Sequence, residues 1–150
     1  MSSLRDKIKM SKEEMTSFLK NQISLQIGTI NKDGSPHLTT MWYLYDGESF
    51  IFHTYTKSQK IINLKRDSRI TVLTEAGSQY SDLQGIIAYG EAEIINGEHN
   101  PEEVIKYMDK VGNKYIKGED SAQYLEGMKL QAPKRSVVLI NPSKFISWDH

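Results

Sequence analysis

The chain has 150 residues, a length typical of one domain with one hydrophobic core. Its 19 Lys and Arg residues balance 19 Asp and Glu residues, and this zero net charge argues against a broad surface for nucleic acid or an anionic membrane. The absence of cysteine excludes disulfides, thiolate nucleophiles and Cys-based metal sites. Because neither a signal-peptide core nor a bilayer-spanning stretch is found, we expect a soluble, cytoplasmic protein.

The first third of the chain predicts a helix followed by strands joined through tight turns. Ser11 and Glu14 form a capping-box pattern at the start of a helix over residues 11–21. Apolar and polar residues alternate over 23–30, which is typical of a strand with one buried face. Turn residues at 31–34 lead to a second strand that starts at Pro36, and turn residues at 46–47 lead from it to a third strand at 49–54. We expect these three strands to form an antiparallel meander.

The rest of the chain predicts further strands with helices between them. The helices are expected at 58–65, 100–115 and 121–130, the strands at 69–74, 85–95, 135–142 and 143–148, and a polar loop at 75–84. Asn100 as N-cap and Pro101 at the first helical position mark the start of the longest helix. Gly90 suggests a bulge, and Pro142 is expected to separate the last two strands because it cannot donate to a ladder.

The order of these elements predicts the fold class. Strands at hairpin spacing without a strict strand–helix alternation argue against a doubly wound parallel sheet. A mostly β protein with peripheral helices, whose antiparallel sheet is closed or nearly closed into a barrel, fits the pattern better. Closure removes the unpaired edges that an open sheet would expose.

The segment after the third predicted strand has the features of a phosphate site. Ser58 is a plausible N-cap, and Lys60 lies in the first helical turn, where the helix dipole disfavours a cation unless an anion compensates. Thr54 and Thr56, at the end of the strand, add hydroxyl donors. On these residues alone, a capped connector with Lys60 pointing to water is the more frequent outcome.

The second predicted strand has two contrasting faces. Alternation separates Leu38, Thr40, Trp42 and Leu44 from His37, Thr39, Met41 and Tyr43. One face would fill the barrel, and the other would suit a flat heterocycle, although packing is the commoner role of such side chains. The four histidines show no metal-binding spacing, and neither a nucleophile elbow nor a glycine fingerprint is present. We therefore assign no metal site and no catalytic residue.

Four sequence blocks, in this order, carry a resemblance to a known family. They are IGTINKDGSPHLTTMWYLYDGESFIFHT (27–54), KSQKIINLKRDSRITVLTE (57–75), GIIAYGEAEII (85–95) and RSVVLINPSKFISWD (135–149). The series resembles the pyridoxamine 5'-phosphate oxidase-like family of FMN-binding split β-barrels. The resemblance implies a six-stranded antiparallel Greek-key split barrel that forms a homodimer, with an FMN site at the interface for each subunit.

The resemblance also implies which residues hold the cofactor. Ser58, Gln59 and Lys60 match the phosphate-binding S-x-K triplet of the family, and His53 and Thr54 would line the ribityl–phosphate path. The flavin ring would lie along the second strand, at Thr39, Thr40, Met41 and Trp42.

One position departs from the family pattern. Many relatives have Arg where this chain has Gln59, and losing such a charged donor removes roughly 1.5–3 kcal/mol unless Lys57 or a partner residue substitutes. Trp148 and the loop at 75–84 are further candidates to cover the site.

The resemblance implies a flavin-dependent oxidoreductase that acts on a small molecule. The C-terminal PSKFISWDH lacks the Arg- and His-containing motif of true pyridoxamine-phosphate oxidases, so we expect a different substrate. Two alternatives remain open on the same fold: a reductase that uses a deazaflavin coenzyme, and a non-catalytic module that binds flavin or haem.

Overall fold

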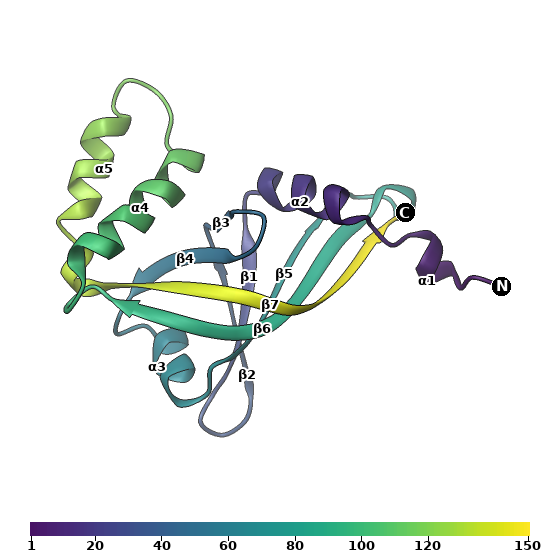
Figure 1. The fold of residues 1–150 in the computed structure, drawn as a ribbon, viewed down its shortest axis with the longest axis horizontal. Coiled ribbons are helices and arrows are strands. Elements are labelled where there is room, and N and C mark those ends of the chain that lie inside the picture. Colours follow the sequence, from purple (N-terminus) through teal and green to yellow (C-terminus); the bar gives the residue numbers. More distant parts are fainter.

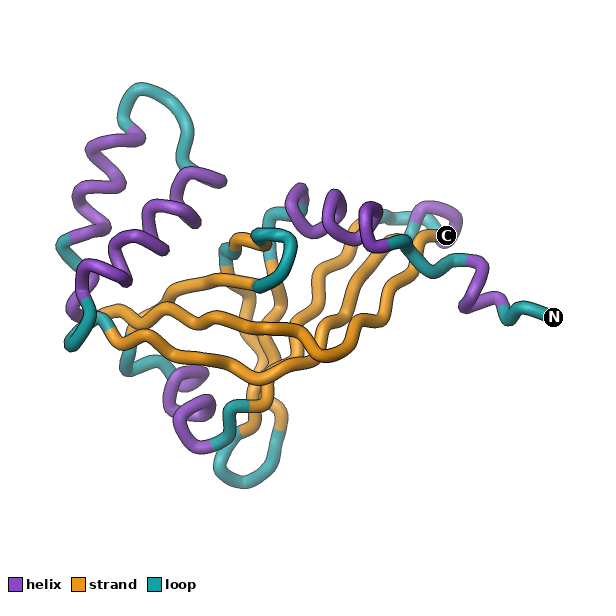
Figure 2. The backbone as a smooth tube through the Cα atoms, viewed as in Figure 1, coloured by secondary structure: helices purple, strands orange, loops and turns teal.

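The computed structural model describes residues 1–150 and shows one long curled sheet with helices around it (Figures 1 and 2). The helices are α1 (Leu4–Lys7), α2 (Lys12–Asn21), α3 (Gln59–Arg66), α4 (Pro101–Tyr115) and α5 (Ser121–Lys129). The strands are β1 (Leu25–Ile30), β2 (Pro36–Met41), β3 (Leu44–Tyr45), β4 (Phe50–Tyr55), β5 (Arg69–Ala76), β6 (Gln84–Asn96) and β7 (Arg135–Asp149). None of the helices is long and apolar enough to cross a membrane.

All neighbouring strands of the sheet are antiparallel, in the order β2-β1-β5-β6-β7-β4-β3. The mostly β half-barrel is confirmed, with seven strands rather than six. The two expected hairpins are confirmed, because β1 pairs with β2 and β3 pairs with β4, but the expected second strand is divided into β2 and β3. The three strands therefore form no continuous meander, and the other partner of β4 is β7. The chain leaves β2 at Trp42 and buries Tyr43 completely before β3 begins, so β2 and β3 lie at opposite ends of the strand order.

Strand β7 runs unbroken through Pro142, contrary to the expected division into two strands. Pro142 lies opposite Gly90, and the register with β6 shifts between Tyr89 and Gly90, where the predicted bulge occurs. Ser143 is the extra residue on β7, and its hydroxyl donates to the Tyr89 carbonyl at 3.2 Å. The ladder is already irregular here, so the missing N–H of proline is tolerated.

The expected polar loop at 75–84 is shorter than the sequence indicated. Strand β5 continues to Ala76, and a single 3-10 turn, Tyr80–Asp82, precedes β6. The Asp82 carboxylate closes this turn by accepting from the backbone N–H groups of Ser78 and Gln79, at 3.0 and 2.6 Å. The residues between the two strands thus form a tight turn at one end of the sheet.

The helix-start signals read from the sequence are confirmed. At α2, the Ser11 hydroxyl accepts from Glu14 N at 3.1 Å, and the Glu14 carboxylate accepts from Ser11 N at 2.7 Å. Helix α4 begins at Pro101 with Asn100 as its N-cap. The short α1, which the sequence reading did not anticipate, begins with a similar box formed by Ser3 and Asp6.

Strand β4 is buried on both faces because it separates two hydrophobic cores. Phe50 and Phe52 point into the main core, a cluster of 17 buried residues enclosed by the curled sheet. Ile51 points the other way, into a smaller core that β4 and β7 share with α4. Consecutive side chains of β4 therefore face different parts of the molecule, which decides how the functional residues at its end are arranged.

We expect Gly85→Ala to destabilise the fold and Gly127→Ala to stabilise it slightly. A Cβ at Gly85 would lie 2.1 Å from the Trp148 ring, so the overpacked variant should lose roughly 1–3 kcal/mol of unfolding free energy. A Cβ at Gly127 in α5 meets open space, and the better helix former should add roughly 0.5–1 kcal/mol. Urea denaturation of both variants tests this, and equal midpoints would contradict it.

Candidate functional site

The end of β4 and the start of α3 form the strongest candidate site. The Ser58 N–H donates to the Tyr55 carbonyl at 3.0 Å, and this turn leads directly from the strand into the helix. Ile61 and Leu64 of α3 pack in the main core. The fully buried Asn63 donates to the Thr29 hydroxyl at 3.1 Å, which fixes the helix against β1.

Lys60 is a buried cation without a carboxylate partner. Lys60 is only 8 % exposed, and its Nζ donates to Thr54 Oγ1 at 3.4 Å. The three ion pairs of the chain involve Arg69 and Lys129 instead. Burial lowers the pKa of Lys60 below its ordinary value, because the charged form has lost water and gained no countercharge. An anion bound here would supply the missing charge.

Ser58 occupies the N-cap position of α3 without capping the helix. Its Oγ is buried and has no hydrogen-bond partner, and no side chain caps the helix. The positive end of the helix dipole and unpaired backbone N–H groups lie at the same place. An orphaned hydroxyl, a buried ammonium and a helix N-terminus within three residues provide the donor types that a phosphate requires.

Gln59, the departure from the family triplet, is turned along the helix. Its Nε2 donates to the Asn63 side chain at 2.8 Å, and Arg66 reaches the same oxygen at 3.3 Å. Gln59 thereby joins the polar network that holds α3 on β1. Within the triplet, only Lys60 provides a positive charge.

The structure separates His53 from its predicted neighbour Thr54. Thr54 faces Lys60, whereas the His53 Nδ1 lies 3.3 Å from Arg135 Nη1, on the face of β4 that carries Ile51. Burial, and then the Arg135 charge, lower the pKa of His53 from 6.5 to about 4. The imidazole is thus neutral at pH 7. Because the His53 side chain points to the other face of β4, only its main-chain groups could contribute to a site at Thr54 and Lys60.

The four predicted residues around β2 do not share one face. The Thr39 Oγ1 is buried without a hydrogen-bond partner, and Met41 packs against the main core, while Thr40 is exposed. The Trp42 ring stacks parallel on Tyr115 of α4, with 4.4 Å between the ring centroids, and stays 46 % exposed. For Met41, the packing role left open by the sequence is observed.

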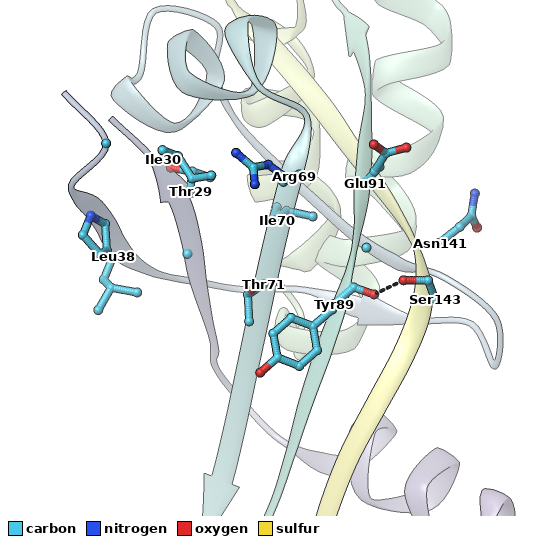
Figure 3. A pocket seen from close by; sticks show the side chains of 14 residues that line it. Thr29, Ile30, Leu38, Arg69, Ile70, Thr71, Tyr89, Glu91, Asn141 and Ser143 are labelled. Atoms are coloured by element: carbon cyan, nitrogen blue, oxygen red, sulfur yellow. Dashed lines mark hydrogen bonds between the residues drawn. The ribbon is translucent and has the colours of Figure 1, made fainter. Parts of the chain in front are cut away.

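Two adjoining clefts lie on the sheet face that points away from the main core. The larger has a volume of about 930 Å³ and is lined by Arg69, Tyr89, Glu91 and other residues of β1, β2, β5, β6 and β7 (Figure 3). The smaller, about 360 Å³, contains Thr39 and Thr40, and the two share Gly28, Leu38, Thr71 and Tyr89. Neither is lined by Ser58 or Lys60.

Sequence reasoning missed these clefts because their walls come from strands whose order the sequence does not show. The sequence pattern that could have revealed the clefts is the series of outward-facing residues on the predicted strands. Leu38, which is 72 % exposed, is one of them. No cluster of three or more His, Asp or Glu side chains could hold a metal ion.

Trp148 and the turn before β6 lie at the far end of the sheet from Lys60. Along β7, Ser136 pairs with Thr54, whereas Trp148 pairs with Gly85. The twelve residue steps from Ser136 to Trp148 correspond to roughly 40 Å of extended strand. Trp148 therefore does not cover the site of its own chain, and neither does the turn, which hydrogen-bonds to the C-terminus through the Leu83 carbonyl.

A model of the pyridoxamine 5'-phosphate oxidase family matches residues 11–149. The chain belongs to this family. Comparison with curated proteins gives no match.

Solved structures agree with the family assignment. The conserved hypothetical protein Rv2991 from Mycobacterium tuberculosis is 35% identical, with a TM-score of 0.84 over 99% of this chain and 91% of that one. An F420 reductase is 21% identical (TM-score 0.62, 86% of this chain and 93% of that one). The haem storage protein HutZ from Vibrio cholerae is 12% identical (TM-score 0.70, 90% and 93%). At these low identities, the F420 reductase and HutZ show only that their fold is the same as that of this chain.

We expect acid to destabilise the fold through His53. The unfolded chain protonates this imidazole near pH 6.5 and the folded chain only near pH 4, so stability is complete above pH 6.5 and falls towards pH 4. This lowering of the His53 pKa corresponds to a loss of roughly 3 kcal/mol at low pH.

Denaturation at a series of pH values, on wild type and His53→Gln, measures this effect. The variant should lose most of the slope between pH 4 and 6.5, whereas the control His99→Gln, at an exposed position, should keep it. A slope that survives in His53→Gln would refute the assignment.

Proposed function

We propose that the chain binds the phosphate of FMN at Ser58 and Lys60 and acts as a flavin-dependent oxidoreductase on a small molecule. The observation that carries the proposal is the buried Lys60 ammonium, which has a hydroxyl partner but no countercharge. An anionic ligand bound beside Lys60 would remove this cost.

The residues present fit a phosphate group. Lys60 would neutralise part of its charge, while the hydroxyls of Ser58 and Thr54 and the N-terminus of α3 would donate hydrogen bonds. Gln59 would contribute through its backbone N–H, because its side chain is bonded to Asn63. The exposed Lys57 is the nearest further cation in the sequence.

The ring of the flavin would lie along β2. Thr39 offers a buried hydroxyl without a partner, and Thr40, Met41 and Trp42 would contribute main-chain groups. The exposed side of the Trp42 ring, stacked on Tyr115, is a further flat surface. A bound flavin supplies the redox chemistry itself, and the chain binds and orients it and limits the access of solvent. We therefore assign no general acid or base.

A deazaflavin coenzyme is the second candidate. The F420 reductase with the same fold supports it, and an anion site at Lys60 suits any phosphate-bearing cofactor equally. A non-catalytic haem-binding module is the third candidate, and it is supported only by the similarity of the fold to that of the haem storage protein HutZ. An absorption spectrum of the purified protein, with mass spectrometry of the released ligand, separates the three, because the deazaflavin spectrum is blue-shifted from that of FMN and haem absorbs differently from both.

The oxidoreductase claim is tested separately by reduction of the bound flavin. Anaerobic mixing with NADH or NADPH should bleach the flavin absorbance, and a small-molecule acceptor should restore it. A flavin that no electron donor reduces would leave a binding module and remove the enzyme claim.

We propose that a second copy of the chain covers the face of the sheet that holds the two clefts. Leu38 and Tyr89 are 72 % and 38 % exposed there, beside Leu73 and Ile87, which is much apolar surface for a sheet face in water. Such a dimer would close the groove beside Thr39 and Thr40 and place the ring between two subunits.

Lys60→Ala should weaken FMN binding by tenfold or more and leave riboflavin binding nearly unchanged. The removed interaction is a charged hydrogen bond worth roughly 1.5–3 kcal/mol, and riboflavin lacks the phosphate that receives it. Fluorescence titration of both ligands measures the two affinities.

Lys65→Ala is the matched control, because Lys65 lies on the same helix and is exposed. It should bind both ligands as the wild type does. Equal weakening of FMN and riboflavin by Lys60→Ala would contradict a phosphate role.

Light scattering should give about twice the chain mass of 17.2 kDa. Leu38→Glu should shift the protein to the monomer, because it places a charge in the middle of the proposed contact. Leu130→Glu, at a leucine that is 85 % exposed outside this face, should remain dimeric. A wild-type monomer that binds FMN fully would contradict the shared site.

A further inference from the structure

Arg135 is a further cation without a countercharge, at the same end of β4 as Lys60 but on its other face. Arg135 pairs with Tyr55 in the last step of the β4–β7 ladder, and its guanidinium carbon lies 4.3 Å from the centre of the Tyr55 ring. Figure 1 shows α3 on one side of this end of the sheet and α4 with α5 on the other. Lys60 belongs to the α3 side, and the His53 contact of Arg135 belongs to the α4 side.

Only neutral groups hold the Arg135 guanidinium in place. Nε and Nη2 donate to Gln131 Oε1 at 3.1 and 2.9 Å, and Nη1 lies 3.3 Å from His53 Nδ1. The imidazole is neutral at pH 7, so it accepts the hydrogen bond without cancelling the charge. The guanidinium is therefore positioned from three directions and keeps its full charge.

The guanidinium retains free donors for a ligand. Arginine carries five N–H groups, and three of them are used by Gln131 and His53, which leaves one on each terminal nitrogen. Two N–H groups in the plane of one guanidinium match the geometry of a carboxylate or phosphate. The residue is partly exposed, so such a group can reach it from solvent.

The surrounding charge favours an anion. Residues 49–66 and 129–148, which include β4, α3 and most of β7, contain no Asp or Glu in a chain whose net charge is zero. Lys57 and Lys134 are both exposed near this end, where the Thr56 N–H donates to the Lys134 carbonyl at 2.9 Å. Lys57 and Lys134 therefore add positive charge beside Arg135, while the acidic residue just after β6 is Glu98, next to the Gly97 whose N–H donates to the Arg135 carbonyl.

We propose that Arg135 forms a second anion-binding site, which takes a phosphate or carboxylate group other than the phosphate at Lys60. The group belongs either to an extension of the cofactor, as in a dinucleotide, or to a separate substrate or electron donor. The site stands independently of flavin binding at Lys60, because the two cations face opposite sides of β4.

Titration with inorganic phosphate, followed by NMR of the arginine Nε–H signals at constant ionic strength, tests the site. The Arg135 signal, identified by its loss in Arg135→Gln, should move saturably. The Arg69 signal should not, because Asp67 already pairs with Arg69 at 2.7 Å. An Arg135 signal that moves no more than that of Arg69 would overturn the proposal.

His53 provides a second measurement that needs no variant. An anion at Arg135 would offset the charge that helps to depress the pKa of His53, so phosphate should raise that pKa above about 4. NMR titration of the imidazole, with and without phosphate, measures the change. An unchanged pKa under saturating phosphate would contradict contact between anion and guanidinium.

Two further variants identify the source of the anionic group. If Arg135→Gln weakens FAD binding by tenfold or more but leaves FMN binding unchanged, the cofactor carries the anionic group. If the variant binds FAD and FMN as the wild type does, while phosphate still binds the wild type, a separate molecule carries the group. Lys60→Ala should keep the phosphate response of Arg135. If both Lys60→Ala and Ser58→Ala keep the wild-type affinity for FMN, the proposed flavin site is refuted. The proposed Arg135 site would be unaffected by that result.

Discussion

The double burial of β4 is the constraint on which the site depends. A strand packed between two cores has to alternate its side chains strictly, so Phe52 and Thr54 face one side and Ile51 and His53 the other. Where β4 leaves the cores, this alternation continues into polar residues. The end of β4 thus contacts two cations on opposite faces, Lys60 of α3 through Thr54 and Arg135 of β7 through His53.

The buried Lys60 is a cost to stability that the fold has retained. Lys60 is buried beside a hydroxyl, and Arg135 is held by an amide and a neutral imidazole, although a nearby carboxylate would satisfy either cation. The buried residues elsewhere are mainly apolar, and helix α3 is fixed by the hydrogen bonds of Asn63 to Thr29 on β1 and to Asn31 just after it. This frame holds the uncompensated Lys60 charge in place, which fits a trade between stability and binding.

In the proposed dimer, assembly and flavin binding would be linked through the sheet face that carries the clefts. Leu38 and Tyr89 stay exposed there because the curl of the sheet directs the alternate residues, such as Ile27 and Val72, into the main core. Thr39 and Thr40 lie at the margin of the same face. A partner that covers this surface would exclude water from the ring of a bound flavin, which strengthens the electrostatic control that the protein exerts on it.

The sequence by itself determined the local features: the capping box of α2, the start of α4, the bulge at Gly90, and the mismatch of Lys60 with the dipole of α3. Each depends on residues a few positions apart. Tertiary structure decided the pairing of β4 with β7, the continuous strand through Pro142, the separation of His53 from Thr54, and the distance of Trp148 from Lys60. These depend on which distant strands share a core, and a period-two pattern records only that one face is buried, not which partner buries it.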